Sequence, residues 1–535
     1  MNVFLLRLLL FLVVCRGGMA MGEEPMPIDL LLSNGQIHSG DGKPATVGHV
    51  AITADRIVAI GKIDPDSRPL RTIDCSGLII SPGFIDLHNH SDQEILEKET
   101  CSAMNYLTQG CTTVVTGNCG SGPIDVAEYY DAIDKRGVGP NVMHLLPQGG
   151  LRKRVIGSER RKATAQELEQ MCQLTDKAMR EGAWGMSTGL IYVPSSYADT
   201  DELISIAEVV GRHGGIYASH IRNEGMRLLD SVEEALKIGQ QARLPVHISH
   251  FKSSGKDSWG LVRTAVEMIK QRRSDGQIVT ADQYPYTASS TSLSATCIPS
   301  WARSGGRKKM IGRIEKGDEQ SQRIKDAILK KLEITDNGHR IQIGSYAKQP
   351  QWAGRRLDDI ASELNLTPFE LVLQIERSGG ASVVNHSIDE MDVRFVMQQR
   401  WVATASDGSA KVPSDSAPHP RNYGTFPRRI GFYANREKVI SMEQAIYSST
   451  GLPAEILGIE DRGLLVAGSI ADIAVFDPAS FIDRSTFIDP HQYGEGLVHL
   501  FVNGRPAILR SRATGALSGR AIRKQTKELK PSKMQ

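Results

Sequence analysis

The stretch Asp86-Leu87-His88-Asn89-His90-Ser91-Asp92 follows a largely apolar segment, residues 78–85, that is typical of a buried β-strand. On a strand, side chains two residues apart point to the same side, so His88 and His90 can converge on one metal ion. A His-x-His pair alone is weak evidence, because paired surface histidines have the same pattern. The pair indicates a metal site only if further ligands come from elsewhere in the chain.

Four further residues supply such ligands, each at or just after the end of a short apolar run. Cys119 follows residues 113–116, His220 follows 215–219, His250 follows 246–249 and Asp407 follows 402–406. A single buried histidine is usually structural, but six potential ligands at five strand ends are not expected by chance. Because Cys, His and carboxylate together suit Zn²⁺ better than Mg²⁺ or Ca²⁺, the sequence predicts a zinc centre.

The region that holds these runs, roughly residues 83–457, alternates between strand and helix patterns. Further strand-like runs lie at 185–188 and 278–281, and helical patterns cover 165–181, 200–212 and 231–241. Reactive groups at the ends of alternating strands are typical of a TIM-like (β/α)8 barrel, an α/β fold whose sites lie on that face. Residues 302–350 are highly charged and break the alternation, so we predict an insertion over the barrel mouth.

Two β-rich parts of the chain flank this predicted barrel. Their strand-like segments, several with Asn-Gly or Asp-Gly turns, are residues 28–37, 47–60, 463–477 and 496–502. We therefore expect one small sheet domain assembled from residues 21–82 and 458–515. The basic tail, residues 516–535, is expected to be disordered.

Residues 1–20 have the pattern of a secretory signal peptide, with a basic start, an apolar stretch and Gly18-Met19-Ala20 at the end. This predicts a periplasmic or secreted protein. Two alternatives stay open: initiation at Met19 or Met21, and lipidation of Cys15. No later run of about 18 apolar residues follows, so we predict no membrane span in the mature chain.

The bulk composition argues for a small-molecule partner rather than a nucleic acid. The net charge is +2 and no large basic patch is present, so the electrostatic pattern of a nucleic-acid-binding protein is missing. Six cysteines remain after the leader, and their wide, irregular spacing does not resemble a disulfide framework. The oligomeric state is left open.

Beyond the ligands, the chain contains long motifs between residues 28 and 510. They are residues 81–90, 117–120, 187–194, 219–225, 247–252, 282–290, 405–408 and 419–428. With them the sequence resembles the N-acyl-D-amino-acid deacylases (D-aminoacylases) of the amidohydrolase superfamily. The resemblance implies a barrel with a small β-sandwich, and hydrolysis of N-acyl-D-amino acids to a carboxylate and a free D-amino acid.

The resemblance also implies roles for particular residues. It implies a tight zinc site of Cys119, His220 and His250, and a weaker second site of His88, His90 and Asp407. The substrate carboxylate would be bound by Lys252, by Tyr284 or Tyr286, and by Arg421. One of the two tyrosines, which flank Pro285, is open to a packing role instead.

Elementary chemistry agrees with this assignment. Amide hydrolysis near neutral pH needs a nucleophile stronger than water, and Zn²⁺ lowers the pKa of bound water from about 15.7 to about 7. A carboxylate beside that water can take its proton and pass it to the departing nitrogen, and Asp407 is the candidate for this general base and acid. Lys252 and Arg421 carry the charges that would hold a carboxylate, Arg421 as a bidentate fork.

Two positions depart from the family pattern. Gln148 stands where the family often has His, so a polar contact near the substrate is expected to differ. Asn89 stands between the two histidines where Thr is commoner, and its side chain is expected to point away from the metal.

Two other functions are alternatives to the deacylase. A cyclic-amide hydrolase of the dihydroorotase or hydantoinase type usually bridges two metals with a carboxylated lysine on the fourth strand. Residues 182–190 contain no lysine, and Cys119 is a ligand that such enzymes lack. A non-catalytic scaffold would typically have lost the His-x-His pair or the Asp, and this chain has both.

Overall fold

The computed structural model describes residues 28–64 and 66–525. The predicted leader lies outside these residues, so export stays a prediction, and the last ten residues of the predicted tail also lie outside. The prediction of disorder is wrong for the described start of the tail, because Ala521 forms a bridge with Val142 and the Ile522 N–H donates to the Val142 carbonyl at 2.8 Å. None of the helices in the described part of the chain combines the length and apolar character that crossing a bilayer requires.

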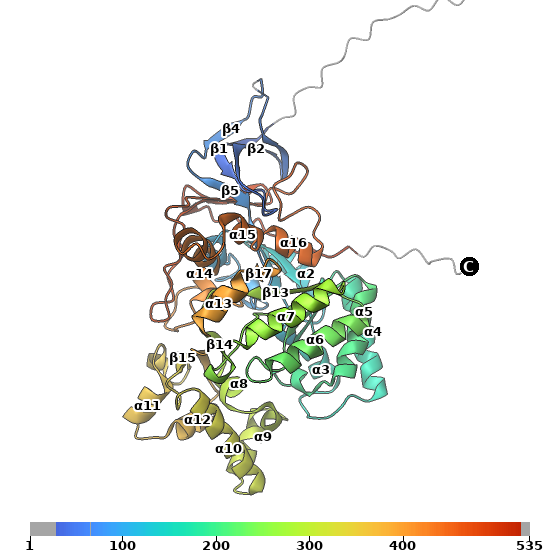
Figure 1. The fold of residues 1–535 in the computed structure, drawn as a ribbon, viewed down its shortest axis with the longest axis vertical. Helices are drawn as coiled ribbons and strands as arrows, with labels where there is room; N and C mark the ends of the chain where they lie inside the picture. Colours follow the sequence, from blue (N-terminus) through green and yellow to red (C-terminus); the bar gives the residue numbers. More distant parts are fainter. Residues whose placement is uncertain (1–27, 65, 526–535) are drawn as a thin grey trace, which may run out of the picture.

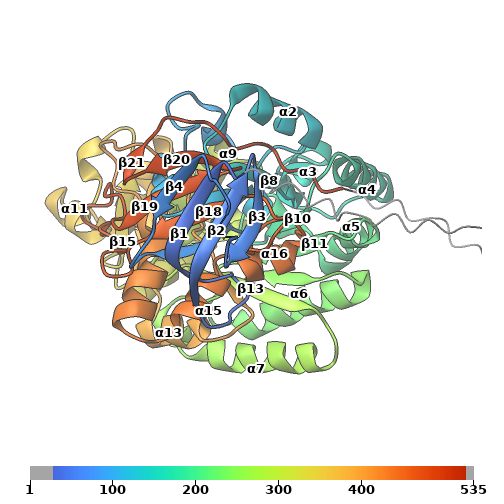
Figure 2. The ribbon, with the colours of Figure 1, turned by 90° about the horizontal axis from the view of Figure 1, so that it is seen from above.

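One nine-stranded sheet is built from both ends of the described chain. Its strands are β1 (Leu30–Ile37), β2 (Thr46–Thr53), β3 (Arg56–Gly61), β4 (Arg71–Asp74), β5 (Ile79–Pro82), β18 (Ile473–Phe476), β19 (Leu497–Val502), β20 (Arg505–Leu509) and β21 (Arg512–Ala513). The order is β21-β20-β19-β18-β5-β1-β2-β3, with β4 beside β1. The antiparallel pair of β5 and β18 therefore joins the two ends of the chain. Figure 2 shows the blue and red strands of this sheet from above.

A second set of strands is entirely parallel and forms the centre of the molecule (Figure 1). It comprises β6 (Phe84–Asp86), β7 (Cys111–Thr116), β8 (Asn141–His144), β9 (Leu146–Pro147), β10 (Gly185–Gly189), β11 (Ile216–His220), β12 (Val246–Ile248), β13 (Val279–Gln283) and β17 (Val402–Thr404). One group runs β6-β7-β8, and the other runs β9-β10-β11-β12-β13-β17. Only Leu145 separates β8 from β9.

The two outer strands of this set meet just beyond β6 and β17. The backbone N–H of Asp407 donates to the carbonyl of His88, and the N–H of His90 donates to the carbonyl of Gly408, at 2.8 and 2.7 Å. These bonds hold the His-x-His segment beside the segment that carries Asp407.

Helices follow most of the parallel strands and cover their outer side. They include α1 (Met104–Leu107), α2 (Val126–Arg136), α3 (Gln148–Val155), α4 (Ala165–Arg180), α5 (Thr200–Arg212), α6 (Leu228–Ala242), α7 (Leu261–Ser274), α13 (Glu390–Met397), α15 (Met442–Tyr447) and α16 (Gly451–Leu457). A capping box between Thr164 and Glu167 fixes the start of α4. On α5 the apolar residues Leu203, Ile206 and Val210 are buried, at the spacing of one helix face.

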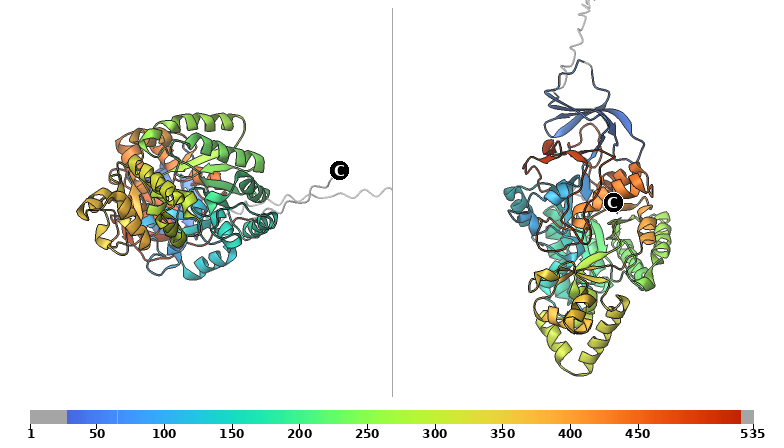
Figure 3. Two further views of the ribbon diagram at one scale, coloured as in Figure 1. Left: turned by 90° about the horizontal axis from the view of Figure 1, so that it is seen from below. Right: turned by 90° about the vertical axis from the view of Figure 1, so that its left-hand side faces the viewer.

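The segment between β13 and α13 forms a separate unit with its own hydrophobic core. It contains β14 (Ser289–Ser292), α8 (Leu293–Cys297), α9 (Arg307–Glu315), α10 (Glu319–Ile334), β15 (Ile341–Ser345), α11 (Leu357–Glu363), α12 (Pro368–Arg377) and β16 (Ser382–Asn385). The unit is wider than the predicted insertion 302–350, because its antiparallel strands β14 and β16 lie outside the charged stretch. Figure 3 shows this unit at the end of the molecule opposite the nine-stranded sheet. We call residues 289–385 the insertion.

Candidate metal centre

The carboxyl ends of the parallel strands bring all six predicted ligands together. His88 and His90 follow β6, and Cys119 lies in the short 3-10 turn Asn118–Gly120 after β7. His220 is the last residue of β11, while His250 and Asp407 come just after β12 and β17. Because neighbouring parallel strands end at the same edge, side chains that are far apart in the sequence meet there.

Cys119 lies at the middle of the cluster. Its Sγ is 3.2 Å from His88 Nε2, 3.6 Å from His220 Nδ1 and 3.7 Å from His250 Nε2. In a tetrahedral zinc site, sulfur at about 2.3 Å and nitrogen at about 2.0–2.1 Å from the ion lie about 3.5 Å apart. The donor types and their spacing therefore fit a zinc ion.

The ligands form two groups that share this cysteine. Cys119, His220 and His250 make one group, and His88, His90, Cys119 and Asp407 make the other. Within each group the ligand atoms lie within 4.8 Å of one another. Asp407 Oδ1 is 3.1 Å from His90 Nε2 and 3.5 Å from His88 Nε2. Two adjacent metal positions thus fit these side chains.

Three of the six ligands have a left-handed backbone conformation. The φ angles are 51° at Cys119, 37° at His250 and 52° at Asp407. Residues other than Gly, Asn and Asp rarely adopt such angles, which cost of order 1–3 kcal/mol each. Hydrogen bonds stabilise these backbone conformations. The His250 N–H, for example, donates to Asp282 Oδ1 at 2.7 Å.

Asp282 is a functional residue that the sequence analysis did not single out. This fully buried carboxylate accepts a hydrogen bond from the His250 backbone, and its Oδ2 lies 3.3 Å from His88 Nδ1 and 2.9 Å from His247 Nε2. Burial alone would raise the pKa of Asp282, but the neighbouring His88 and His247 lower it well below its usual range. A carboxylate at Nδ1 leaves Nε2 of His88 to face the metal position.

Glu224 orients His250 in the same way, and the sequence patterns did not reveal this role either. Its Oε1 lies 2.8 Å from His250 Nδ1 and 2.6 Å from Lys252 Nζ. Burial would raise the pKa of Glu224, but the charge of Lys252 and then His250 hold it far below its usual value. The motif 219–225 contains Glu224, but its partners lie on the next strand, so spacing gave no signal for its role.

Of the predicted carboxylate-binding groups, three lie beside the centre. The ring of Tyr284 lies close to two cations, 5.5 Å from Lys252 Nζ and 4.8 Å from Arg421 Cζ. Its hydroxyl is buried and has no hydrogen-bond partner among the described residues. Arg421, the first residue of α14 (Arg421–Pro427), lies 2.7 Å from Asp407 through Nη1.

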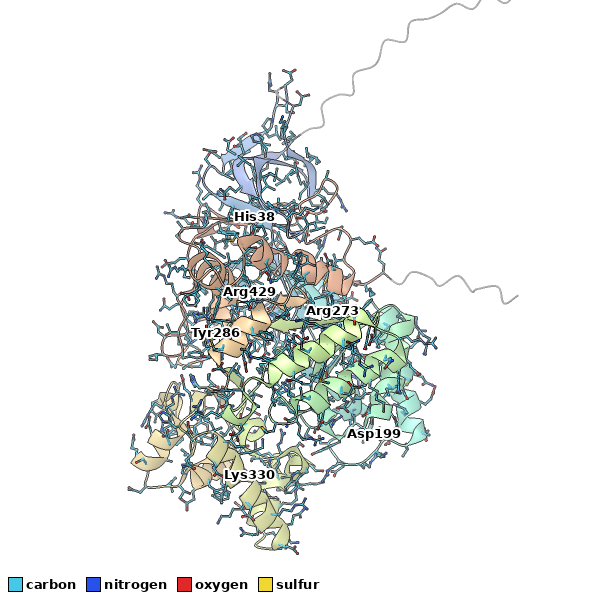
Figure 4. The ribbon with its side chains drawn as sticks, in the orientation of Figure 1. His38, Asp199, Arg273, Tyr286, Lys330 and Arg429 are labelled. Atoms are coloured by element: carbon cyan, nitrogen blue, oxygen red, sulfur yellow. The ribbon has the colours of Figure 1, made fainter. Side chains whose placement is uncertain are left out.

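Tyr286 does not join them. Its ring packs edge-on against His419 and Phe487, and Arg428 lies over it at 5.0 Å. It lines neither of the two cavities beside the centre. Figure 4 labels Tyr286 at the left of the molecule, below Arg429 and above Lys330. Of the two tyrosines, only Tyr284 lines a cavity beside the centre, although both rings pack against His419.

Gln148 is likewise engaged with protein rather than with a cavity. Its Nε2 donates to Glu202 Oε1 at 3.0 Å, and its Oε1 accepts from Ser195 Oγ at 2.5 Å. Glu202 also pairs with the buried Arg152. Where this chain departs from the family pattern at Gln148, the change therefore affects a buried hydrogen-bond network, and Gln148 lines neither cavity.

Two cavities of about 530 Å³ each open beside the ligands. The insertion-side cavity is lined by His220, His250, Lys252, Tyr284 and residues of the insertion. The glycine-lined cavity contains His90, Cys119, Arg421 and Gly120, Gly122, Gly149 and Gly150. Both include Asp407, and both are bordered by Tyr192 and Thr291, whose hydroxyls lie 3.0 Å apart. A substrate at the metal centre thus has room on two sides.

Comparisons with known proteins identify the family of the chain. The Amidohydrolase family pattern matches residues 308–508. A D-aminoacylase from Alcaligenes xylosoxydans xylosoxydans is 32% identical over 524 residues, which cover 94% of this chain and 98% of the relative. A crystal structure of D-aminoacylase matches with a TM-score of 0.81 and 31% identity, over 93% of this chain and 100% of that one.

A further match is the N-acyl-D-glutamate deacylase of Bordetella bronchiseptica, solved with zinc and a phosphonate that mimics the tetrahedral intermediate. Its TM-score is 0.81 at 29% identity, over 93% of this chain and 100% of that one. The protein thus has the fold of the amidohydrolase superfamily. Within that class, the chain belongs to the N-acyl-D-amino-acid deacylase (D-aminoacylase) family.

Proposed function

We propose that this protein hydrolyses the amide bond of N-acyl-D-amino acids with zinc as its cofactor. The observation that carries the proposal is the convergence of six metal-ligand side chains at one edge, with Lys252 and Tyr284 in the adjoining cavity. The family relationship supports the same reaction.

Cys119, His220 and His250 would hold the tight zinc ion, and His88, His90 and Asp407 would complete a second position beside it. When bound, Zn²⁺ acts as a Lewis acid and makes water a nucleophile near neutral pH. Asp282 and Glu224 fix the orientation of His88 and His250 from behind.

Asp407 is the group suited to move the proton. It lines both cavities, and the charges of Arg421 and the nearby histidines outweigh burial and hold its pKa well below the usual value. The carboxylate is therefore ionised and able to accept the proton of the attacking water and to deliver it to the leaving nitrogen.

Lys252 and Tyr284 would bind the α-carboxylate of the substrate. Lys252 stays charged despite burial, because the Glu224 carboxylate raises its pKa. Tyr284 lines the same cavity, and its hydroxyl is a donor without a partner among the described residues. Arg421 contributes a second positive charge close to the Tyr284 ring.

We also propose the finer architecture expected from the sequence. The meeting of the strand ends beyond β6 and β17 supports a closed (β/α)8 barrel. The bridge between Arg56 and Ile470, together with a separate apolar core that includes Leu32, Val50 and Val475, supports a β-sandwich formed by the mixed sheet.

The test is a substrate screen with zinc-loaded protein. N-acetyl-D-amino acids should be hydrolysed, and the matching L-isomers should be poor substrates. Dihydroorotate and hydantoins represent the cyclic-amide alternative, which the absence of lysine in β10 disfavours. Turnover of the cyclic amides alone would replace the proposal.

A further inference from the structure

Asp92 ends the stretch of sequence that contains the ligands His88 and His90, yet it belongs to neither group of metal ligands. Its side chain is buried. A buried carboxylate is costly unless it is hydrogen-bonded, so the partner of such a group indicates its role.

The partner of Asp92 is the loop that carries the ligand Cys119. Asp92 Oδ1 accepts a hydrogen bond from the backbone N–H of Gly117 at 2.7 Å. At the other end of the loop, a Cβ atom on Gly122 would lie only 2.5 Å from the same oxygen, so the Gly122 backbone packs closely against the carboxylate. The carboxylate therefore lies against both ends of residues 117–122, which we call the cysteine loop.

The cysteine loop needs support because its backbone is unfavourable. Four of its six residues have left-handed φ angles: 77° at Gly117, 51° at Cys119, 69° at Gly120 and 136° at Gly122. Glycine adopts such angles at little cost, whereas a cysteine is strained there and keeps the conformation only where its surroundings hold it. The position of the thiol group thus depends on contacts that fix the loop from outside.

Two such contacts attach the loop to the chain on either side of the His-x-His pair. Asn118 Nδ2 donates to the carbonyl of Leu87, just before His88, at 3.1 Å. Asp92 makes the second attachment, two residues after His90. Because the cysteine and the His-x-His pair belong to the same ligand group, these attachments bear directly on the distances within that group.

The buried His144 gives Asp92 no alternative role as half of an ion pair. His144 Nδ1 is 3.8 Å from Asp92 Oδ1 but 2.9 Å from Thr116 Oγ1, and its Nε2 is 2.9 Å from the carbonyl of Pro123. A carbonyl only accepts, so Nε2 carries the hydrogen. Burial lowers the pKa of His144 to about 4, so the ring is neutral and Nδ1 has no hydrogen to donate.

We propose that Asp92 is a positioning residue for the zinc ligand Cys119. Its carboxylate closes the cysteine loop and keeps the thiol group beside the His-x-His pair, where Sγ lies 3.2 Å from His88 Nε2. The inference rests on the metal centre of the proposed function and not on its substrate. Asp282 and Glu224 orient ligand side chains, whereas Asp92 acts on the backbone that carries a ligand.

The variant Asp92→Ala removes the acceptor for the Gly117 N–H. Its zinc affinity, measured by competition with a chelator, should fall by about 10–100-fold, the usual effect of losing an outer partner of a metal ligand. In the cobalt-substituted variant, the absorption band of the thiolate–metal bond should weaken or shift. Unchanged affinity together with an unchanged band would overturn the proposal.

Asp92→Asn separates the hydrogen bond from the charge. The amide keeps an oxygen that can accept from the Gly117 N–H, so zinc affinity should stay within a few-fold of the parent and the cobalt band should be retained. A loss as large as that of Asp92→Ala would contradict positioning through this bond. Asp125→Ala is the matched control, because it removes a surface carboxylate, paired with Arg154 at 2.7 Å, and should leave both readouts unchanged.

Gly122→Ala tests the same contact with Asp92 in place, in case Asp92→Ala does not fold. The added methyl group would meet the Asp92 carboxylate and displace it from the Gly117 N–H, so zinc affinity should fall. Gly157→Ala is its control, since Gly157 also has a positive φ, 86°, but no neighbour within 4 Å of the added Cβ. Equal zinc affinities in these two variants would overturn the proposal.

The same measurements keep this inference apart from the proposed reaction. A thiolate band that depends on Asp92, without turnover of any N-acyl-D-amino acid, would refute the reaction and retain the role of Asp92. Turnover by a parent whose zinc affinity and band do not depend on Asp92 would retain the reaction and refute that role. A parent without any thiolate band would refute Cys119 as a ligand and this inference with it.

Discussion

The guanidinium of Arg421 lies 2.7 Å from the carboxylate of Asp407. The residue predicted to bind the substrate is therefore paired with the residue predicted to move the proton. Arg421 is buried and Asp407 nearly so, so each charge depends on the other. Substitution of either one is expected to change the chemistry as well as the binding of substrate.

Asp407→Asn should retain the metal held by Cys119, His220 and His250 and lose proton transfer. General-base steps contribute about 10²–10⁴-fold, so kcat should fall by that range with little change in KM. Steady-state kinetics and zinc analysis check this. Asp415→Asn, an exposed carboxylate in the same loop, is the control. If Asp407 only caps its turn, Asn would serve equally well and kcat would stay within a few-fold of the parent.

Arg421→Met should impair N-acyl amino acids and the corresponding amino-acid amides alike. Loss of the guanidinium removes the charge that lowers the pKa of Asp407, so that pKa should rise. The carboxylate then becomes ionised only at higher pH, and the acidic limb of the kcat/KM profile should move upward. A selective loss on carboxylate-bearing substrates with an unmoved profile would instead make Arg421 purely a substrate-binding residue.

Tyr284→Phe should weaken binding of substrates that carry an α-carboxylate. The lost hydroxyl is a free donor beside Lys252, and one hydrogen bond to a charged group contributes about 1.5–3 kcal/mol, or about ten- to a hundredfold in KM. Tyr286→Phe is the matched control, since its hydroxyl is equally buried but lies outside both cavities. Equal effects of the two variants would remove Tyr284 from the substrate site.

Cys119→Ala should lose most of the tightly bound zinc, because thiolate is a strong ligand and two histidines remain in that group. Metal analysis after dialysis checks the loss. Cys111→Ala controls for removal of a buried thiol from the preceding strand, and it should keep its zinc. A full equivalent of zinc in Cys119→Ala would exclude the cysteine as a ligand.

Glu224→Gln should weaken zinc binding by about 10–100-fold, the usual effect of losing a carboxylate behind a metal-ligating histidine. It should also free Lys252, whose ion pair with Glu224 is lost. Competition with a chelator measures the affinity. Unchanged zinc affinity with a raised KM would assign Glu224 to the positioning of Lys252 alone.

Much of the site was predictable, because strand ends in a parallel set converge by topology. The apolar runs before Cys119, His220, His250 and Asp407 were enough to place them at one edge. Asp282 and Glu224 were not found, since their roles depend on which side chains of neighbouring strands face each other. Local spacing contains no information on such pairs.

The limits of the insertion were predicted too narrowly, and the choice between Tyr284 and Tyr286 stayed open, for a related reason. The core of the insertion contains residues of the charged stretch 302–350, such as Ile324 and Ile341, and it also uses Leu293, Leu371 and Val383 outside that stretch. Tyr284 and Tyr286 are the same residue type and are equally buried, so the sequence does not distinguish them. Only the three-dimensional structure shows that Tyr284 lines the cavity.

The seam between β5 and β18 has a consequence for biosynthesis. A ribosome that has just completed Ile79–Pro82 must add about 390 further residues before Ile473–Phe476 emerges, which takes roughly 20–80 s at about 5–20 residues per second. During that interval one edge of β5, with Ile79 and Ile80, has no strand beside it. An open apolar edge invites aggregation, so this edge stays exposed to wrong pairing until β18, close to the C-terminal end of the described residues, has been translated.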